Sequence, residues 1–337
     1  MWMTRGLTIL VMAGTLRAGA QQAGYERDSK WEKVCAAAKA QPIAIPKIEH
    51  RGLEACDETA LYYGISGKPD YVAALKCGWY ERAHPQETVG NMFYGPGVLA
   101  MLYANGQGVR RDYDLAIRFA CEETWAAEVE MELRIGHLEY LRDNKIRGTS
   151  FDLCDDITSG LSMGTCTRVG TDTREFARES KVKAFENGLA LNARKAFAKL
   201  REAEKKFEED RGANEVDLSG TARGMFVAED EDKLREQFLI NLQRFAKQDI
   251  PAANTRDLAA LDAALNSTYK RIQSAPVESM GTVTAGGVRL TERSWLELVS
   301  AWEDFGRVAY PKLSSTQIRA QLVRLRLHQL RAIVPAE

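Results

Sequence analysis

The chain has 337 residues, of which 28% are charged and 45% hydrophobic, and its formal net charge is −1. This balance leaves no basic surplus to bind a phosphate backbone, so we expect no nucleic-acid partner. The length suggests two domains rather than one, each with enough apolar side chains to form a core.

Residues 1–20 have the pattern of a secretory signal peptide. Arg5 provides a short positive start, residues 6–16 are mostly apolar, and Ala18-Gly19-Ala20 is a small-residue cleavage site. We therefore predict export to the periplasm or the exterior, with cleavage near Ala20. Loss of the two arginines in this segment would change the net charge from −1 to −3, which allows attraction to a cationic partner. No segment is apolar over the length of a membrane-spanning helix.

Two segments of the first half align at an offset of 42 residues. Gly64 matches Gly106, and Asp70-Tyr71 matches Asp112-Tyr113. A period in this range is typical of helical-hairpin solenoids. We expect Gly106 to end one helix in the left-handed conformation and Asp112 to cap the next helix.

The second of these segments, 98–122, resembles a Sel-one-like repeat, a relative of the tetratricopeptide array. Its letters AMLYANGQGVRRDYDLA, at 100–116, carry nearly the whole motif, whereas 57–83 matches more loosely. The resemblance implies a short α-solenoid over residues 25–141 that contacts proteins rather than performing chemistry. The other interpretation is that the repeats only build and cap the fold. A third, incomplete helix pair is predicted from Ala126, with an apolar stripe that contains Met131, Leu133, Ile135, Leu138 and Leu141.

The second half is predicted to be a helical bundle. Residues 142–149 are polar and are expected to be a linker. Beyond residue 176, apolar side chains recur at helical spacing in five stripes, one of which runs from Leu290 through Trp295 to Phe305. The glycine-rich segment around Ala285-Gly286-Gly287 is expected to form a short hairpin. The run REAEKKFEED at 201–210 is interpreted as a solvated helix face with i,i+4 ion pairs, the alternative being an acidic binding strip.

Three motifs of this half resemble the lysozyme inhibitor LprI-like domain. Cys154-Asp155 and Cys166 precede a long charged helix, and residues 261–269 are similar to the family's D-x-x-L-N-x-x-Y helix. Residues 290–302 are similar to its L-x-x-A-Q-x-x-W-x-x-Y-R-D helix, but Leu298-Val299-Ser300 replaces Tyr-Arg-Asp. The resemblance covers residues 154–335, within a helical domain that we predict over 150–335. It implies an exported helical protein that inhibits lysozyme-type muramidases.

The six cysteines are an even number in a chain predicted to be exported, which indicates disulfides, with fifteen possible connectivities. The disulfide that we predict first is Cys154–Cys166. The second predicted disulfide is Cys56–Cys77, which would join the two helices of the first repeat. Cys35 and Cys121 remain without an assigned partner.

Residues 160–164 read Gly-Leu-Ser-Met-Gly, a G-x-S-x-G pattern that can mark the nucleophile of a serine hydrolase. A nucleophile elbow needs a preceding strand, which residues 154–159 do not provide, and the only later histidine is His328. We therefore expect Ser162 to be a loop or helix-edge residue and the glycines to serve a turn. No catalytic residue, cofactor or metal site is predicted, because the histidines are scattered and no C-x-x-C occurs.

The sequence thus predicts an all-α protein in which a short Sel-one-like solenoid is followed by a helical bundle, with few or no strands. The predicted function is non-catalytic binding of a protein in the cell envelope, with inhibition of a lysozyme-type muramidase as the leading case. The alternative is a structural or assembly scaffold that binds another envelope protein through its repeats. A serine hydrolase that uses Ser162 is the remote alternative.

Overall fold

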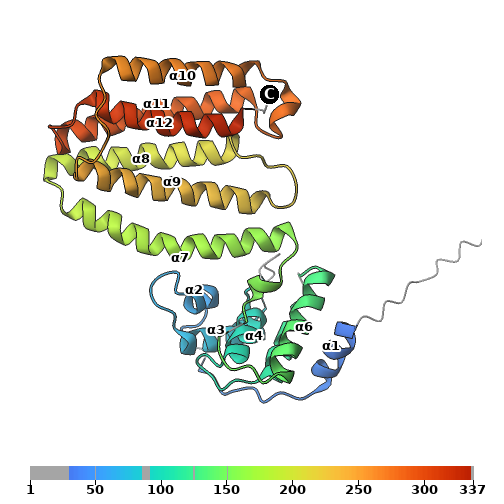
Figure 1. Cartoon of the computed structure of the whole chain (residues 1–337). Coiled ribbons are helices and arrows are strands. Elements are labelled where there is room, and N and C mark those ends of the chain that lie inside the picture. The colour runs from blue at the N-terminus through green and yellow to red at the C-terminus, as the bar shows by residue number, and fades with distance from the viewer. Residues whose placement is uncertain (1–29, 50, 86–91, 124–125, 150, 335–337) are drawn as a thin grey trace, which may run out of the picture.

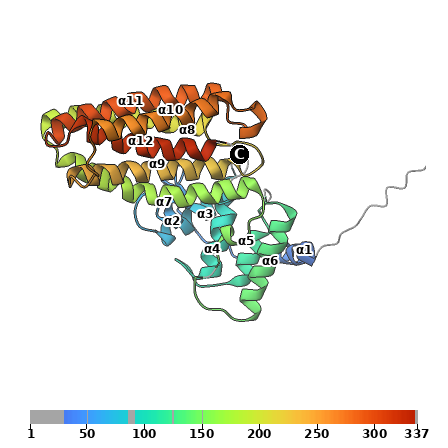
Figure 2. The same ribbon diagram turned by 45° about the horizontal axis from the view of Figure 1, so that its top comes forward.

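In the computed structural model we describe residues 30–49, 51–85, 92–123, 126–149 and 151–334, and the predicted signal segment lies outside these ranges. Every regular element in the described ranges is a helix and none is a strand, which confirms the all-α prediction. Figure 1 shows two parts: a group of short helices in blue to green, and a bundle of long helices in green to red. Both Figure 1 and Figure 2 place α7 (Gly160–Asn187) on the bundle face that meets the short helices.

The N-terminal part consists of short helices in which consecutive elements are neighbours. They are α1 (Lys30–Ala40), α2 (Glu58–Tyr63), α3 (Tyr71–Ala83), α4 (Gly95–Asn105), α5 (Tyr113–Ala120) and α6 (Glu128–Asp143). From α2 to α6 each helix of this series packs on the next, as in a helical solenoid, and α1 contacts α5 and α6.

The repeat offset of 42 residues recurs in the backbone hydrogen bonds. The Asp70 amide donates to the Leu61 carbonyl over 2.9 Å, and the Asp112 amide donates to the Tyr103 carbonyl over 3.0 Å. Both aspartates also cap the helix that follows with their side chains. Gly106 ends α4 with φ 65°. The predicted roles of Gly106 and Asp112 are therefore confirmed, and Asp70 caps its helix in the same way.

The predicted third helix pair contains one long helix, α6. Met131, Ile135 and Leu138 of its expected stripe are buried. Leu133 is 46% exposed, so its assignment to that stripe was wrong. The reason is the helical period: a residue two positions after Met131 points to the opposite side of the helix.

The C-terminal part is a bundle of long helices. Besides α7 it contains α8 (Leu191–Asn214), α9 (Arg223–Ala246), α10 (Thr255–Ser274), α11 (Ala285–Ala309) and α12 (Ser315–Ile333), with 3₁₀ helices η1 (Leu153–Asp156) and η2 (Val277–Met280). Helix α7 packs along α9, α8 along α11, and α10 along α12.

Two details of this bundle correct the sequence predictions. The glycine-rich segment around Ala285 does not form a hairpin but begins α11, where Thr284 Oγ1 accepts a hydrogen bond of 2.9 Å from the Gly287 amide. A threonine cap explains how a helix can start with two glycines nearby. Leu290, expected in the buried stripe of this helix, is half exposed, whereas Trp295, Trp302 and the rest of the stripe are buried.

The two parts have separate hydrophobic cores, and α7 contributes to both. Phe151, Leu153 and Val169 belong to the N-terminal core, whereas Val182 belongs to the C-terminal core. The boundary between the cores therefore lies within α7 and not in the polar segment 142–149. One continuous helix thus connects the two parts.

Three disulfides join the six cysteines. The predicted pairs Cys154–Cys166 and Cys56–Cys77 are both present. The third, Cys35–Cys121, joins α1 to the end of α5 and spans 86 positions of sequence, so that it attaches α1 to the repeats.

The longest loop should give the largest disulfide stabilisation. By chain entropy, Cys35–Cys121 contributes about 4.6 kcal/mol and Cys154–Cys166 about 3 kcal/mol. We expect the double variant C35A/C121A to lower the unfolding free energy more than C154A/C166A does. Denaturant unfolding of the oxidised variants measures both values. A greater loss of unfolding free energy in C154A/C166A than in C35A/C121A would contradict this order.

Candidate functional site

Ser162, the serine of the G-x-S-x-G pattern, lies in the first turn of α7 and is buried. Its hydroxyl donates a hydrogen bond of 2.9 Å to Oε2 of Glu130, a buried residue of α6. The other oxygen of this carboxylate accepts hydrogen bonds from the amides of Thr158 and Ser159. Burial raises the pKa of Glu130, but these hydrogen bonds outweigh burial and hold the pKa below its usual value. Ser162 is thus bonded to a carboxylate that caps α7.

His328, the histidine that a hydrolase triad would require, lies on α12. That helix packs on α10 and α11, while the start of α7 is bonded to α6. Among the described residues, no hydrogen bond joins His328 to Ser162. Ser162 and His328, the two residues that the hydrolase alternative needs, are therefore not brought together as a catalytic pair.

The glycines of the pattern permit close packing. A Cβ atom on Gly160 would lie 2.1 Å from the backbone of Thr221, and one on Gly164 would lie 3.4 Å from the backbone of Gly224. The first turns of α7 thereby approach the start of α9 closely. The expectation that these glycines serve a turn was wrong, because both lie inside the helix.

Gly160→Ala should lower the unfolding free energy by about 2 to 3 kcal/mol, because the added methyl group overlaps backbone atoms that cannot yield independently. Gly170→Ala on the same helix is the matched control, since its Cβ would meet only the Arg174 side chain, at 3.6 Å. The control should keep or gain stability. Denaturant unfolding compares them, and equal stability would contradict the close approach.

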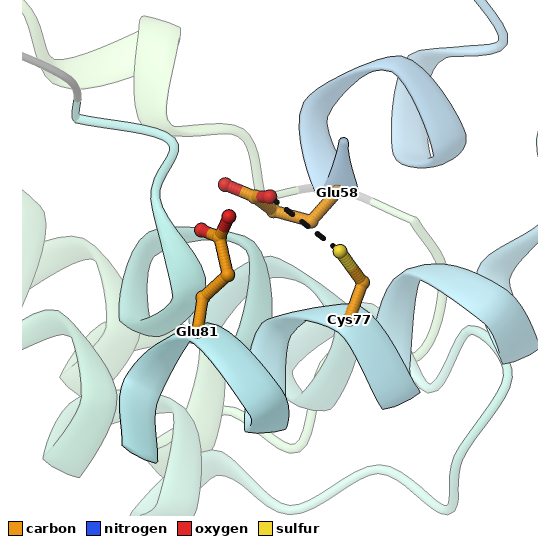
Figure 3. A group of neighbouring side chains, drawn as sticks. All are labelled: Glu58, Cys77 and Glu81. Carbon is orange, nitrogen blue, oxygen red and sulfur yellow. Dashed lines mark hydrogen bonds between the residues drawn. The ribbon is translucent and has the colours of Figure 1, made fainter. Parts of the chain in front are cut away.

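A pair of carboxyl groups lies beside a disulfide in the first repeat. Figure 3 shows Glu58 of α2 facing Glu81 and Cys77 of α3. Their ligand atoms lie within 4.8 Å of one another, a spacing that could suit a metal ion. The Cys77 sulfur, however, is bonded to Cys56 and is not a thiolate. The donor set is therefore reduced to two carboxyl groups, which do not make a complete metal site.

Glu58 instead carries a proton. Its side chain is buried, and burial together with the neighbouring Glu81 carboxyl raises the pKa of Glu58 to about 9. Cys77 Sγ lies 3.7 Å from Glu58 Oε2, the contact drawn dashed in Figure 3. A disulfide sulfur has no hydrogen to donate, so any hydrogen bond here takes its proton from Glu58.

Stability should therefore fall as the pH rises. The pKa of Glu58 is near 4.5 when unfolded and about 9 when folded, so the folded state holds the proton more tightly between these values. Glu58→Gln mimics the protonated form and has no proton to lose. Between pH 5 and pH 8 its free energy of unfolding should therefore rise by about 2 to 4 kcal/mol relative to that of the wild type. Thermal unfolding across this range measures the difference.

The exposed Glu54→Gln variant is the control and should follow the wild type. If the stability of the wild type and that of Glu58→Gln change in parallel with pH, Glu58 is not protonated in the folded state.

A cleft of about 680 Å³ is lined by α7, α8 and α9, and it is rich in acidic side chains. Seven glutamates line it against three basic residues. The glutamates are Glu175, Glu179, Glu202, Glu204, Glu208, Glu209 and Glu231. The basic residues are Arg201, Lys205 and Arg235. The lining therefore holds more acidic than basic side chains. Two of these glutamates are paired from outside the lining, because Arg178 donates to Glu175 and Arg168 donates to Glu231.

The two arginines of the cleft make their shorter hydrogen bonds to carboxylates other than Glu204. Arg235 donates to both oxygens of Glu208, with Nε 3.0 Å from Oε1, and Arg201 donates to Glu179. Glu204 receives only a long contact of 3.5 Å from Arg201 to Oε2. Burial raises the pKa of Glu204 to about 8, while the nearby Arg201 and Arg235 oppose this rise and Glu208 and Glu175 add to it.

Part of the charged run 201–210 fits the predicted solvated helix face, and part of it lines the acidic cleft. Lys205–Glu209 and Lys206–Asp210 are i,i+4 pairs of 3.8 Å, as a solvated face requires. Glu204 and Glu208 instead are buried. The signal for this was available in the spacing, because Glu204 falls between Leu200 and Phe207 on the buried stripe of α8.

Comparison with known proteins identifies no relative of this chain. No protein-family model matches it, and no curated protein or solved structure shows significant similarity to it. Within the part of the chain that the structure describes, no helix combines the length and apolar character needed to cross a membrane.

Proposed function

We propose that this chain is an exported, non-catalytic binding protein of the cell envelope, and that its acidic cleft binds a basic protein. A lysozyme-type muramidase, which the protein would inhibit, is the leading candidate for that partner. The observation that carries the proposal is the excess of glutamates over basic side chains in one cleft. Charge complementarity of this kind accelerates association and discriminates between partners.

Three further observations support this proposal. The disulfides fit an oxidising compartment, which is where a muramidase inhibitor would act. Two of the three motifs similar to the LprI-like domain, residues 261–269 and 290–302, lie in the same C-terminal part as the cleft. The Ser162 hydroxyl is buried against Glu130, an arrangement suited to capping a helix.

A specific surface favours the alternative, a scaffold that binds another envelope protein through its repeats. Val129, Leu133 and Tyr140 are between 46% and 60% exposed on α6. Their spacing of four and seven residues places them along one face of that helix. An apolar stripe on the last helix of a solenoid is a suitable surface for another protein.

The test is inhibition of a lysozyme by the protein lacking residues 1–20. We expect micromolar inhibition of cell-wall lysis that weakens as salt rises from 50 to 300 mM, because exposed charges are screened. The rim variant E202K/E209K should weaken inhibition about tenfold.

The variant E128K/E132K changes the net charge equally but on α6, and it should inhibit as the wild type does; Glu128 and Glu132 are exposed. Absence of both binding and inhibition at 50 μM would refute the proposal for that lysozyme. Capture of an envelope protein that V129D/L133D abolishes would then favour the scaffold.

A further inference from the structure

Glu204 differs from the other glutamates of the cleft in being buried without a full set of partners. Only 7% of its surface is exposed. Among the described residues, its Oε1 atom has no hydrogen-bond partner, although it is buried. A buried carboxylate oxygen without a partner loses its hydration and gains nothing in return, so its environment favours a ligand that donates hydrogen bonds.

The surroundings of Glu204 combine charge with apolar walls. Besides the cleft, Glu204 lines an inner cavity of about 50 Å³, together with Phe207, Phe238 and Trp302. A basic side chain has an apolar stem and a charged end, so the stem would lie in the larger cleft while the charged end pairs with the carboxylate beside these apolar walls. The site therefore offers both parts of the contact that a lysine or arginine requires.

The geometry is less suited to a metal ion. Among the described residues, only the group that contains Glu58 brings three ligand atoms within 4.8 Å, and Glu204 is not in it. A divalent ion needs several oxygen ligands at about 2 to 2.6 Å around one point. The cleft also has a volume of about 680 Å³, which is large enough for a side chain that protrudes from a partner protein.

We propose that Glu204 is the anchor of the cleft and receives the guanidinium or ammonium group of one basic side chain of the partner protein. This inference rests on the proposed function, because it names the chemistry of the partner at that same cleft. Because Oε1 has almost no exposed surface, the Glu204 side chain turns toward the cleft when the cation binds and donates to this atom. Arg201 stays paired with Glu179 and Arg235 with Glu208.

Binding at this anchor releases a proton below about pH 8. The raised pKa of Glu204 leaves much of the carboxyl protonated at neutral pH, and a cation stabilises the ionised form. The charged groups that face Glu204 are Glu175 from α7, Arg201 and Glu208 from α8, and Arg235 and Glu231 from α9, with Arg326 of α12 across the inner cavity. Affinity should therefore rise between pH 6 and pH 8.

The experiment is calorimetric titration of the full mature chain with tetra-arginine amide, and with tetra-citrulline amide as the uncharged control peptide. Two buffers of different ionisation enthalpy report the protons released. We expect Glu204→Gln to reduce affinity for tetra-arginine at least tenfold and to abolish proton release. Glu128→Gln, which changes an exposed glutamate of α6 outside the cleft, should change affinity less than threefold.

Circular dichroism checks that Glu204→Gln is folded, as expected from an uncharged side chain of equal size at a buried position. Equal tetra-arginine affinity in Glu204→Gln and wild type would overturn the anchor, and so would equal binding of tetra-citrulline. Displacement of the peptide by Ca²⁺ below 1 mM would overturn it in favour of a metal site.

The same variants tested against a lysozyme separate the two proposals. Lysozyme binding that Glu204→Gln leaves unchanged refutes the anchor but not the proposed function. A wild type that binds tetra-arginine through Glu204 but no lysozyme supports the anchor and refutes the muramidase as the partner.

Discussion

The position of α7 depends on one buried carboxylate. Glu130 of α6 accepts hydrogen bonds from the amides of Thr158 and Ser159 and from the hydroxyl of Ser162. These donors are the groups that the start of a helix leaves without partners, so the carboxylate both satisfies them and complements the positive end of the helix dipole. Because α7 extends for about 42 Å from this point, its start on α6 determines where its second half lies. That half carries Glu175 and Glu179 into the cleft.

Buried charges hold the rest of the bundle in register. Arg178 of α7 donates to Asp232 of α9, and Arg326 of α12 donates to Glu215 after α8. Such pairs gain little net free energy, because burial removes the hydration of both partners. A misaligned helix would leave a buried charge without its partner, which is costly. The pairs therefore favour one alignment of α7 on α9, and this alignment brings the glutamates of α7 opposite those of α8.

The two candidate surfaces differ in chemistry and lie on different parts of the molecule. The cleft is acidic and belongs to the C-terminal bundle, whereas the apolar stripe of α6 belongs to the last repeat. The shared helix α7 makes them parts of one body, since it enters both cores. The protein therefore has one surface suited to a basic partner and a separate surface suited to an apolar partner. Binding at the acidic cleft weakens as the salt concentration rises, whereas binding at the apolar stripe does not, so the salt dependence of binding distinguishes the two contacts.

The sequence by itself determined the features that depend on near neighbours: the helical stripes, the cap at Asp112, the 42-residue repeat and the short-range disulfide Cys154–Cys166. Helical period and capping act over a few residues, so they can be recognised from the letters. Only the tertiary structure decided that Cys35 pairs with Cys121, that Gly160 meets Thr221, and that glutamates of α7, α8 and α9 meet in one cleft. Each of these depends on a partner brought in from far along the chain by packing, and local patterns carry no information about that partner.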